Sequence, residues 1–197
     1  MKDADLKWML GFAFRQRIFD QFDPDDLEAG IFAIREDLVV FLMGGFLKPQ
    51  IMKRFGNYLD DFILDRCQFA DGTVQMDVTL KLKLLGNVTA KYVFEVQECQ
   101  FHKDVHRFIV KFQEDVMFSA LAGFSSLFKS MTQKDSYLEM ISELSNEDFF
   151  RAEGSILTVD LNELPGIKIP SRLHMDFLGC RNGRLEFAFN WEEEGEK

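Results

Sequence analysis

An unbroken alternation of apolar and polar residues runs over positions 74–84 and constrains the fold more than any other feature of the sequence. Every even position in this run is apolar, whereas the odd positions carry Thr, Gln, Asp or Lys. The same period of two recurs over residues 88–96 and 108–112. Alternation places successive side chains on opposite faces of a strand, and one buried face with one hydrated face is typical of antiparallel sheets. The sequence therefore predicts a long antiparallel β-meander over residues 62–113.

Turn signals predict the register of these strands, because residues that face each other across an antiparallel pair lie on one face. We expect a two-residue turn at 71–72, where the sequence is Asp-Gly, and three-residue loops at 85–87 and 181–183. In the second loop, Asn87 is expected to adopt the left-handed conformation. The predicted pairs are Phe69 with Val74 and Cys67 with Met76 for the first turn, Leu84 with Val88 and Leu82 with Ala90 for the second, and Phe177 with Phe187, Met175 with Phe189 and Leu173 with Trp191 for the third.

The first 61 residues are predicted to be helical. Apolar residues recur at nearly every turn of residues 3–22. Asp23 is the expected N-cap of a second helix with Pro24 in its first turn, and this helix is expected to continue to Gly44-Gly45. A third helix is expected to begin near Pro49 and to carry an apolar stripe. That stripe contains Ile51, Phe55, Tyr58, Leu59 and Phe62.

Helices and a second β region are predicted to follow the meander, at 115–144 and 155–191. Residues 116–131 are apolar almost all round, which predicts a buried helix with Asp115 as its cap. A polar helix is expected over 135–144, a strand over 155–161 and then a hairpin that ends at Trp191. The acidic tail 192–197 is expected to be disordered. Because the sequence shows neither an internal repeat nor a linker, residues 1–197 are predicted to form one domain.

The composition narrows the function classes. The formal net charge of -10 disfavours nucleic acid and anionic membranes as partners. The longest uncharged apolar run, residues 38–47, is about half a membrane span, so no transmembrane segment is expected. Three cysteines are too few for a disulfide framework, and the N-terminus carries Asp3 and Asp5 where an export signal would be basic and apolar. These features predict a cytoplasmic location. The 22 Phe residues suit a large core or an apolar cavity.

The sequence offers little catalytic chemistry: it contains neither a Gly-rich phosphate loop, nor a G-x-S-x-G elbow, nor H-E-x-x-H. Cys99, His102 and His106 have zinc-like spacing, but they are expected to straddle a hairpin tip. His106 would then share a face with Phe108 while Cys99 lies with the polar residues, so we expect solvated turn residues and no metal. Asp160 is expected to alternate outward from its strand. The predicted protein is not an enzyme and has no cofactor.

The order of the predicted elements resembles bacterial single-domain members of the tubular lipid-binding superfamily. The resemblance covers residues 62–191 and includes ILTVDLNELPGIKIPSRLHMDFLGCRNGRLEFAFNW from Ile156 onward. It implies a curved antiparallel sheet that wraps a long helix and leaves an apolar groove for a lipid. The predicted fold class is thus α+β, with a long curved meander and a C-terminal hairpin packed against N-terminal helices and the central apolar helix.

Two functional hypotheses follow. In the first, the protein binds a lipid or another elongated apolar ligand under the curved sheet, because apolar walls with few polar groups hold such molecules. In the second, the core is fully packed and the protein is a scaffold or a homodimer that acts through an exposed patch or sheet edge. The residues expected to line the ligand cavity are Met76, Val78, Leu80, Phe94, Val96, Phe108, Val110, Phe112, Leu121 and Phe124.

Overall fold

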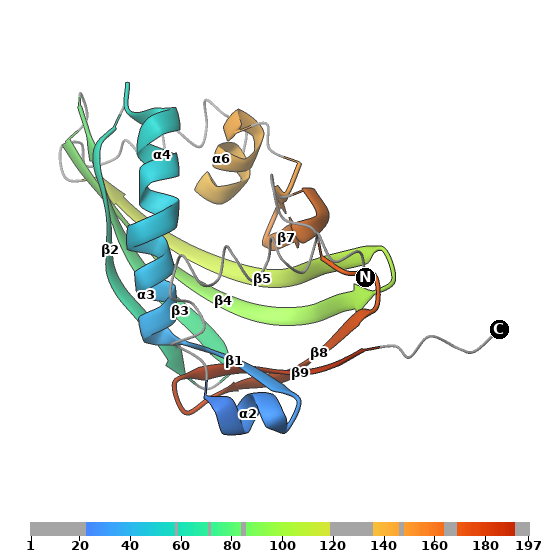
Figure 1. The fold of residues 1–197 in the computed structure, drawn as a ribbon. Coiled ribbons are helices and arrows are strands. Elements are labelled where there is room, and N and C mark those ends of the chain that lie inside the picture. The colour runs from blue at the N-terminus through green and yellow to red at the C-terminus, as the bar shows by residue number, and fades with distance from the viewer. Residues whose placement is uncertain are drawn as a thin grey trace.

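A computed structural model describes residues 23–57, 59–70, 72–83, 86–118, 136–145, 148–163 and 169–191. In these ranges the chain is mainly antiparallel β-sheet with a few helices packed against it, in agreement with the predicted α+β class (Figure 1). The helix expected over 3–22, most of the apolar helix expected over 116–131 and the tail 192–197 lie outside the described residues.

The elements follow one another in a mixed order. The N-terminal part contains α2 (Pro24–Glu28), β1 (Ile31–Arg35), α3 (Glu36–Leu42), a π-helical turn (Met43–Leu47) and α4 (Lys48–Phe55). The meander contains β2 (Leu59–Ala70), β3 (Thr73–Leu82), β4 (Gly86–His102) and β5 (Val105–Phe118). The C-terminal part contains α6 (Tyr137–Ser145), β6 (Phe150–Glu153), β7 (Ile156–Asp160), a 3-10 turn (Leu161–Glu163), β8 (Leu173–Arg181) and β9 (Arg184–Trp191).

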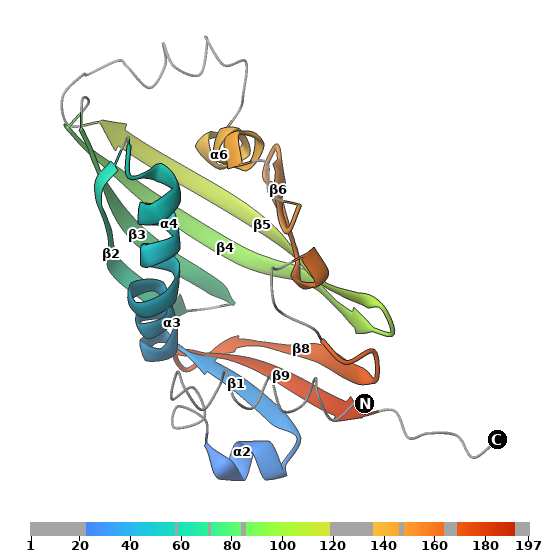
Figure 2. The same ribbon diagram turned by 45° about the horizontal axis from the view of Figure 1, so that its top comes forward.

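Strand β4 is the central strand of the sheet and pairs with β3, β5 and β8. One of its edges pairs with β5 along nearly its whole length, and β5 continues to β7 and β6. Its other edge is shared by two groups of strands. The β2–β3 hairpin pairs with the first half of β4, and β8 joins near its end, where Phe101 faces Met175. We call β2–β3 the first wing and β8–β9–β1 the second wing, and the two diverge from β4 in Figure 2.

The first predicted turn is confirmed: Phe69 faces Val74 and Cys67 faces Met76. The second register is wrong by four residues, because Leu80 faces Val88 and Leu82 faces Gly86. A shift of four preserves the face of every side chain, so both registers satisfy the apolar pattern. The positive φ belongs to Gly86 (71°) rather than to Asn87.

The final hairpin pairs as predicted, with Phe177 facing Phe187, Met175 facing Phe189 and Leu173 facing Trp191. Its turn contains only Asn182 and Gly183, whose φ values of 53° and 72° fit a type I′ turn. The turn is one residue shorter than predicted. A bulge between the Phe177 and Gly179 pairs leaves Leu178 as an extra residue, and this makes up the difference, so the pairs beyond it have the predicted register.

Two parts of the N-terminal prediction are confirmed: the cap at Asp23, and the third helix expected near Pro49, which is α4. The single helix expected from Asp23 to Gly44-Gly45 is wrong. Asp23 caps α2, since its side chain accepts a hydrogen bond from the Asp25 amide at 3.0 Å. The helix does not continue to Gly44-Gly45, because residues 31–35 form β1 and pair with β9. The Gly44-Gly45 pair lies inside the π-helical turn that joins α3 to α4. Leu59 and Phe62 belong to β2 rather than to a helical stripe.

Two further boundaries differ from the prediction. Residues 116–118 extend β5, opposite residues 88–90 of β4, so Asp115 lies inside a strand and caps no helix. Strand β6 was not predicted, and it pairs with β7. The polar helix expected over 135–144 is confirmed as α6. The strand expected over 155–161 is confirmed as β7.

The described core has two buried clusters. The first lies between α6 and the inward faces of the β5–β7–β6 group and contains Val110, Phe112, Leu138, Ala152 and Leu157. The second joins the two wings and is built on Phe69, Val74 and Cys180.

Candidate functional site

The second wing and the far end of the β4–β5 hairpin border an apolar pocket that is open to the surface and has a volume of about 350 Å³. Every lining side chain is apolar, and the residues come from α2, β1, β4, β5, β8, β9 and the turn after β7. We call this feature the apolar pocket. It is lined by Leu27, Phe32, Ile34, Phe101, Phe108, Leu161, Leu173, Met175, Phe187 and Phe189.

Aromatic contacts hold the walls of the apolar pocket together. The Phe108 ring meets Phe187 edge-on at 5.8 Å between centroids and lies 5.1 Å from the Phe101 ring. Phe187 also contacts Phe32, its direct partner across β1 and β9, at 6.2 Å. Phe187 is only 2% exposed, so it is the buried side chain around which the other aromatic residues of the pocket pack.

Glycine permits the close joint between α2 and β9. Gly30 follows α2 with φ 70°, and its carbonyl accepts a hydrogen bond from the Phe189 amide at 2.8 Å. A Cβ at this position would lie 3.3 Å from the Phe189 carbonyl oxygen. An ion pair between Asp26 and Arg184 ties the other side of α2 to β9. The short helix is thereby held where Leu27 reaches the apolar pocket.

A buried imidazole lies among the same residues. His106 is 2% exposed, and its Nδ1 lies 2.7 Å from Oδ1 of Asn162. The Asn162 amide donates from Nδ2 to the Asp104 carbonyl at 2.8 Å, which fixes Oδ1 as the atom that faces the ring. Nδ1 therefore donates, and Nε2 of the neutral ring is left as an acceptor. Nε2 is buried and has no hydrogen-bond partner in the part of the chain that the structure describes.

The zinc-like residues do not share a face. A bulge after Val96 shifts the alternation, so Cys99 faces Phe108 and lies on the inward side, contrary to the prediction. His106 shares that side as expected, whereas His102 is exposed on the other face of the hairpin tip. The Cys99 thiol donates to the Met175 carbonyl at 3.7 Å, and burial, with Asp176 nearby, raises its pKa to about 12. Within the described ranges, no group of three potential ligands is placed to hold a metal ion.

The predicted lining residues are dispersed. Phe108 lines the apolar pocket, whereas Val110 and Phe112 belong to the first core cluster. Met76 packs against the second cluster, and Phe94 packs against both. The other described members lie along the strands of the meander: Val78 is buried, and Leu80 and Val96 are half-buried. Leu121 and Phe124 lie outside the described residues.

Sequence reasoning missed nine of the ten residues of the apolar pocket. Part of the pocket could have been found from the sequence, because the predicted hairpin pairs Met175 with Phe189, and both residues line the pocket. Phe32 and Ile34 alternate on β1 in the same way. Because the sequence pattern assigns residues 31–35 to a helix, it predicts no position for their apolar face over β4 and β5.

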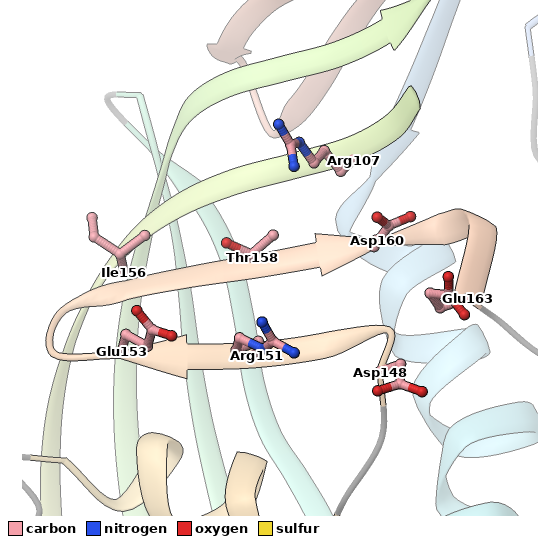
Figure 3. Close-up of a pocket in the computed structure, with 8 residues that line it drawn as sticks. All are labelled: Arg107, Asp148, Arg151, Glu153, Ile156, Thr158, Asp160 and Glu163. Atoms are coloured by element: carbon pink, nitrogen blue, oxygen red, sulfur yellow. The ribbon is translucent and has the colours of Figure 1, made fainter. Parts of the chain in front are cut away.

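A second pocket lies on the outer face of β5, β7 and β6 and is polar, with a volume of about 700 Å³ (Figure 3). Arg107, Thr158 and Arg151 lie on its three strands, and Asp160, Glu163 and Asp148 group at one end. Asp160 faces Arg107 on the outward side, as expected. Side chains of both charges on an exposed sheet face are typical of a hydrated surface, so the apolar pocket is the better candidate site.

Comparison of the chain with known protein families, with curated proteins and with solved structures gives no significant match. Within the described residues, none of the helices is long and apolar enough to cross a membrane.

Proposed function

We propose that the protein binds a lipid-like or other apolar small molecule in the apolar pocket and catalyses no reaction. The observation that carries this proposal is a pocket of about 350 Å³ lined by ten apolar side chains. Ligand pockets commonly have volumes of roughly 300–1,000 Å³ and mainly apolar linings. The proposal agrees with what the resemblance to tubular lipid-binding proteins implies, although it moves the site to the second wing.

The volume limits the ligand. An apolar cavity of about 150 Å³ accommodates benzene, so about 350 Å³ suits a molecule of roughly ten to twelve carbons. Each buried methylene contributes about 0.8 kcal/mol, and ten of them contribute about 8 kcal/mol towards the entropy lost on association. The expected ligand is therefore a medium-length chain or a compact ring system.

A titration with the neutral fluorescent probe N-phenyl-1-naphthylamine tests this function. We expect saturable binding that Leu173→Trp abolishes, because the larger side chain would fill the pocket from β8. Leu178→Trp is the matched control, since Leu178 lies on the same strand but is 48% exposed. It should leave binding unchanged.

Absence of saturable binding to the wild-type protein, with no molecule released by organic extraction, would reject the proposal. A concentration-dependent dimer in sedimentation experiments would then favour the scaffold hypothesis. In that case the exposed side chains of Val40 (48%) and Phe41 (44%) on α3 would be the first surface to mutate.

A further inference from the structure

We propose that His106 is the polar anchor of the apolar pocket and that its Nε2 accepts a hydrogen bond from the hydroxyl group of an otherwise apolar ligand. This inference rests on the proposed function, because it names the class of ligand that the same pocket takes.

The position of His106 supports this role. It directly faces Phe101 across β4 and β5, with ring centroids 5.5 Å apart, and Phe108 is the next residue on its face of β5. On the other side, the Nδ1 atom of His106 contacts Asn162 in the 3-10 turn after β7, the residue that follows Leu161. Phe101, Phe108 and Leu161 all line the apolar pocket. His106 is therefore a buried neighbour of these lining residues and is not itself one of them.

The chemistry of His106 selects the ligand group. The contact between Asn162 and Asp104 orients the amide, and the amide oxygen accepts from Nδ1, so Nε2 of the neutral ring presents a lone pair. A hydroxyl can donate to this lone pair, whereas an ionised carboxylate has only acceptor atoms and would be repelled. An ammonium group could donate, but it would carry an unpaired charge into an apolar pocket. An alcohol is therefore favoured over an anion or a cation.

The burial of Nε2 also favours a ligand that donates a hydrogen bond to it. Buried polar atoms in native proteins nearly always have a hydrogen-bond partner, and a buried acceptor without one lowers stability. Nε2 has none among the described residues. Because the atom is closed to solvent, a ligand reaches it only after a neighbouring side chain rotates. The ligand hydroxyl would then supply the bond that the fold leaves unmade.

A matched pair of ligands tests this inference in the full-length protein. The probes are 1-decanol, which donates a hydrogen bond, and its isomer methyl nonyl ether, which does not, each used to displace N-phenyl-1-naphthylamine. We expect decanol to bind about fivefold more tightly than the ether, as one net hydrogen bond provides. In His106→Phe this preference should disappear, whereas His102→Phe, a control on the exposed side of the same hairpin, should keep it.

Nuclear magnetic resonance provides a readout that does not depend on the folding of a variant. The chain has only 3 histidines, so a protein labelled with ¹⁵N-histidine gives three imidazole signal sets. We expect decanol, and not the ether, to move the Nε2 resonance of His106. Equal binding of the two probes to the wild-type protein, or an unmoved His106 signal with decanol bound, would overturn the anchor and leave the proposed function standing. If neither probe displaced the dye, both proposals would fall.

Discussion

At the residue scale, two cysteine thiols are held in their neutral form by burial. Desolvation, with Glu36 nearby, raises the pKa of Cys67 to about 11, and the pKa of Cys99 is raised to about 12. At pH 8 a thiol with a pKa of 11 is ionised in about one molecule in a thousand, against about one in four for an unperturbed thiol. Because the thiolate is the reactive form, both cysteines should be poor nucleophiles.

We therefore expect iodoacetamide to alkylate Cys67 and Cys99 at least about tenfold more slowly in the folded protein than in the denatured chain at pH 8. The folded-state rate should rise about tenfold for each pH unit between 8 and 10, since the thiolate fraction grows in that proportion below the pKa. Peptide mass spectrometry measures both rates. A rate that levels off below pH 9 would show that the thiols are already ionised and that burial does not protect them.

A single residue also decides which side chains of β4 lie on the inward face near the apolar pocket. Gln97 is the extra residue of the β4 bulge, and it brings Cys99 and Phe101 to the inward face beside His106. The sequence marks this place, because Gln97 and Glu98 are two consecutive polar residues after a stretch in which every even position from 88 to 96 is apolar. Without the bulge, alternation keeps the even positions of β4 on the inward face, so it predicts the wrong face for Cys99. It predicts the correct face for His106, which lies on β5.

At the element scale, one carboxylate of the sheet fixes the first turn of α6. Glu114 lies on the inward face of β5, and its two oxygens accept hydrogen bonds from the Tyr137 and Leu138 amides at 2.6 and 3.1 Å. These are first-turn amides that the helix cannot satisfy itself, and negative charge is favourable at a helix N-terminus. Burial, and to a smaller extent the same carboxylate, raises the pKa of Tyr92, which faces Glu114 across β4 and β5.

Glu114→Gln should therefore loosen α6. An amide group keeps one acceptor and turns the other into a donor that faces an N–H, so we expect a loss of about 1–2 kcal/mol from the local free energy of opening. Hydrogen exchange of the α6 amides should accelerate about tenfold. Asp115→Asn is the matched control. Asp115 is the next residue of β5 and lies on its exposed face, and the substitution removes the same charge. Equal acceleration in both variants would attribute the effect to net charge rather than to the cap.

Elements were predicted well where one local signal decides the structure. The Asp-Gly dipeptide at 71–72 gave the correct register of β2 and β3, because a two-residue turn fixes the pairing of its strands. Between β3 and β4, registers four residues apart satisfy the apolar pattern equally, so sequence alone could not separate them. Residues 31–35 illustrate a third case, since a short apolar run is compatible with both helix and strand until its partner β9 is known.

At the scale of the whole molecule, the candidate site depends on contacts between distant segments. The apolar pocket needs β1 and β9 to lie over the ends of β4 and β5, and Phe32 and Phe187 are separated by most of the chain. Local patterns contain no information about this approach, which explains why the meander could be predicted and the pocket could not. The predicted cavity was placed on the same apolar face of β5, and Phe108 is the residue the two locations share.

The junction between the two wings should make the described sheet unfold as one unit. The turn of the first wing meets β8 through a hydrogen bond from the Gly72 amide to the Cys180 carbonyl at 3.1 Å, and the Cys180 thiol donates to the Thr73 carbonyl at 3.2 Å. Beside this contact, the Phe69 amide donates to Glu36 Oε1 at 2.6 Å, and the Phe69 side chain is 3% exposed in the second core cluster.

Phe69→Ala should lower the free energy of unfolding by about 3–5 kcal/mol, because it leaves a cavity where the wings meet. Urea titrations followed by circular dichroism and by hydrogen exchange should show a single transition displaced to lower urea, with β8 and β9 losing protection together with β2 and β3. Val40→Ala is the control: Val40 is 48% exposed, so the loss should stay below about 0.5 kcal/mol. If the variant lost protection only in β2 and β3, the wings would be separate folding units and their contact at Cys180 would not couple them.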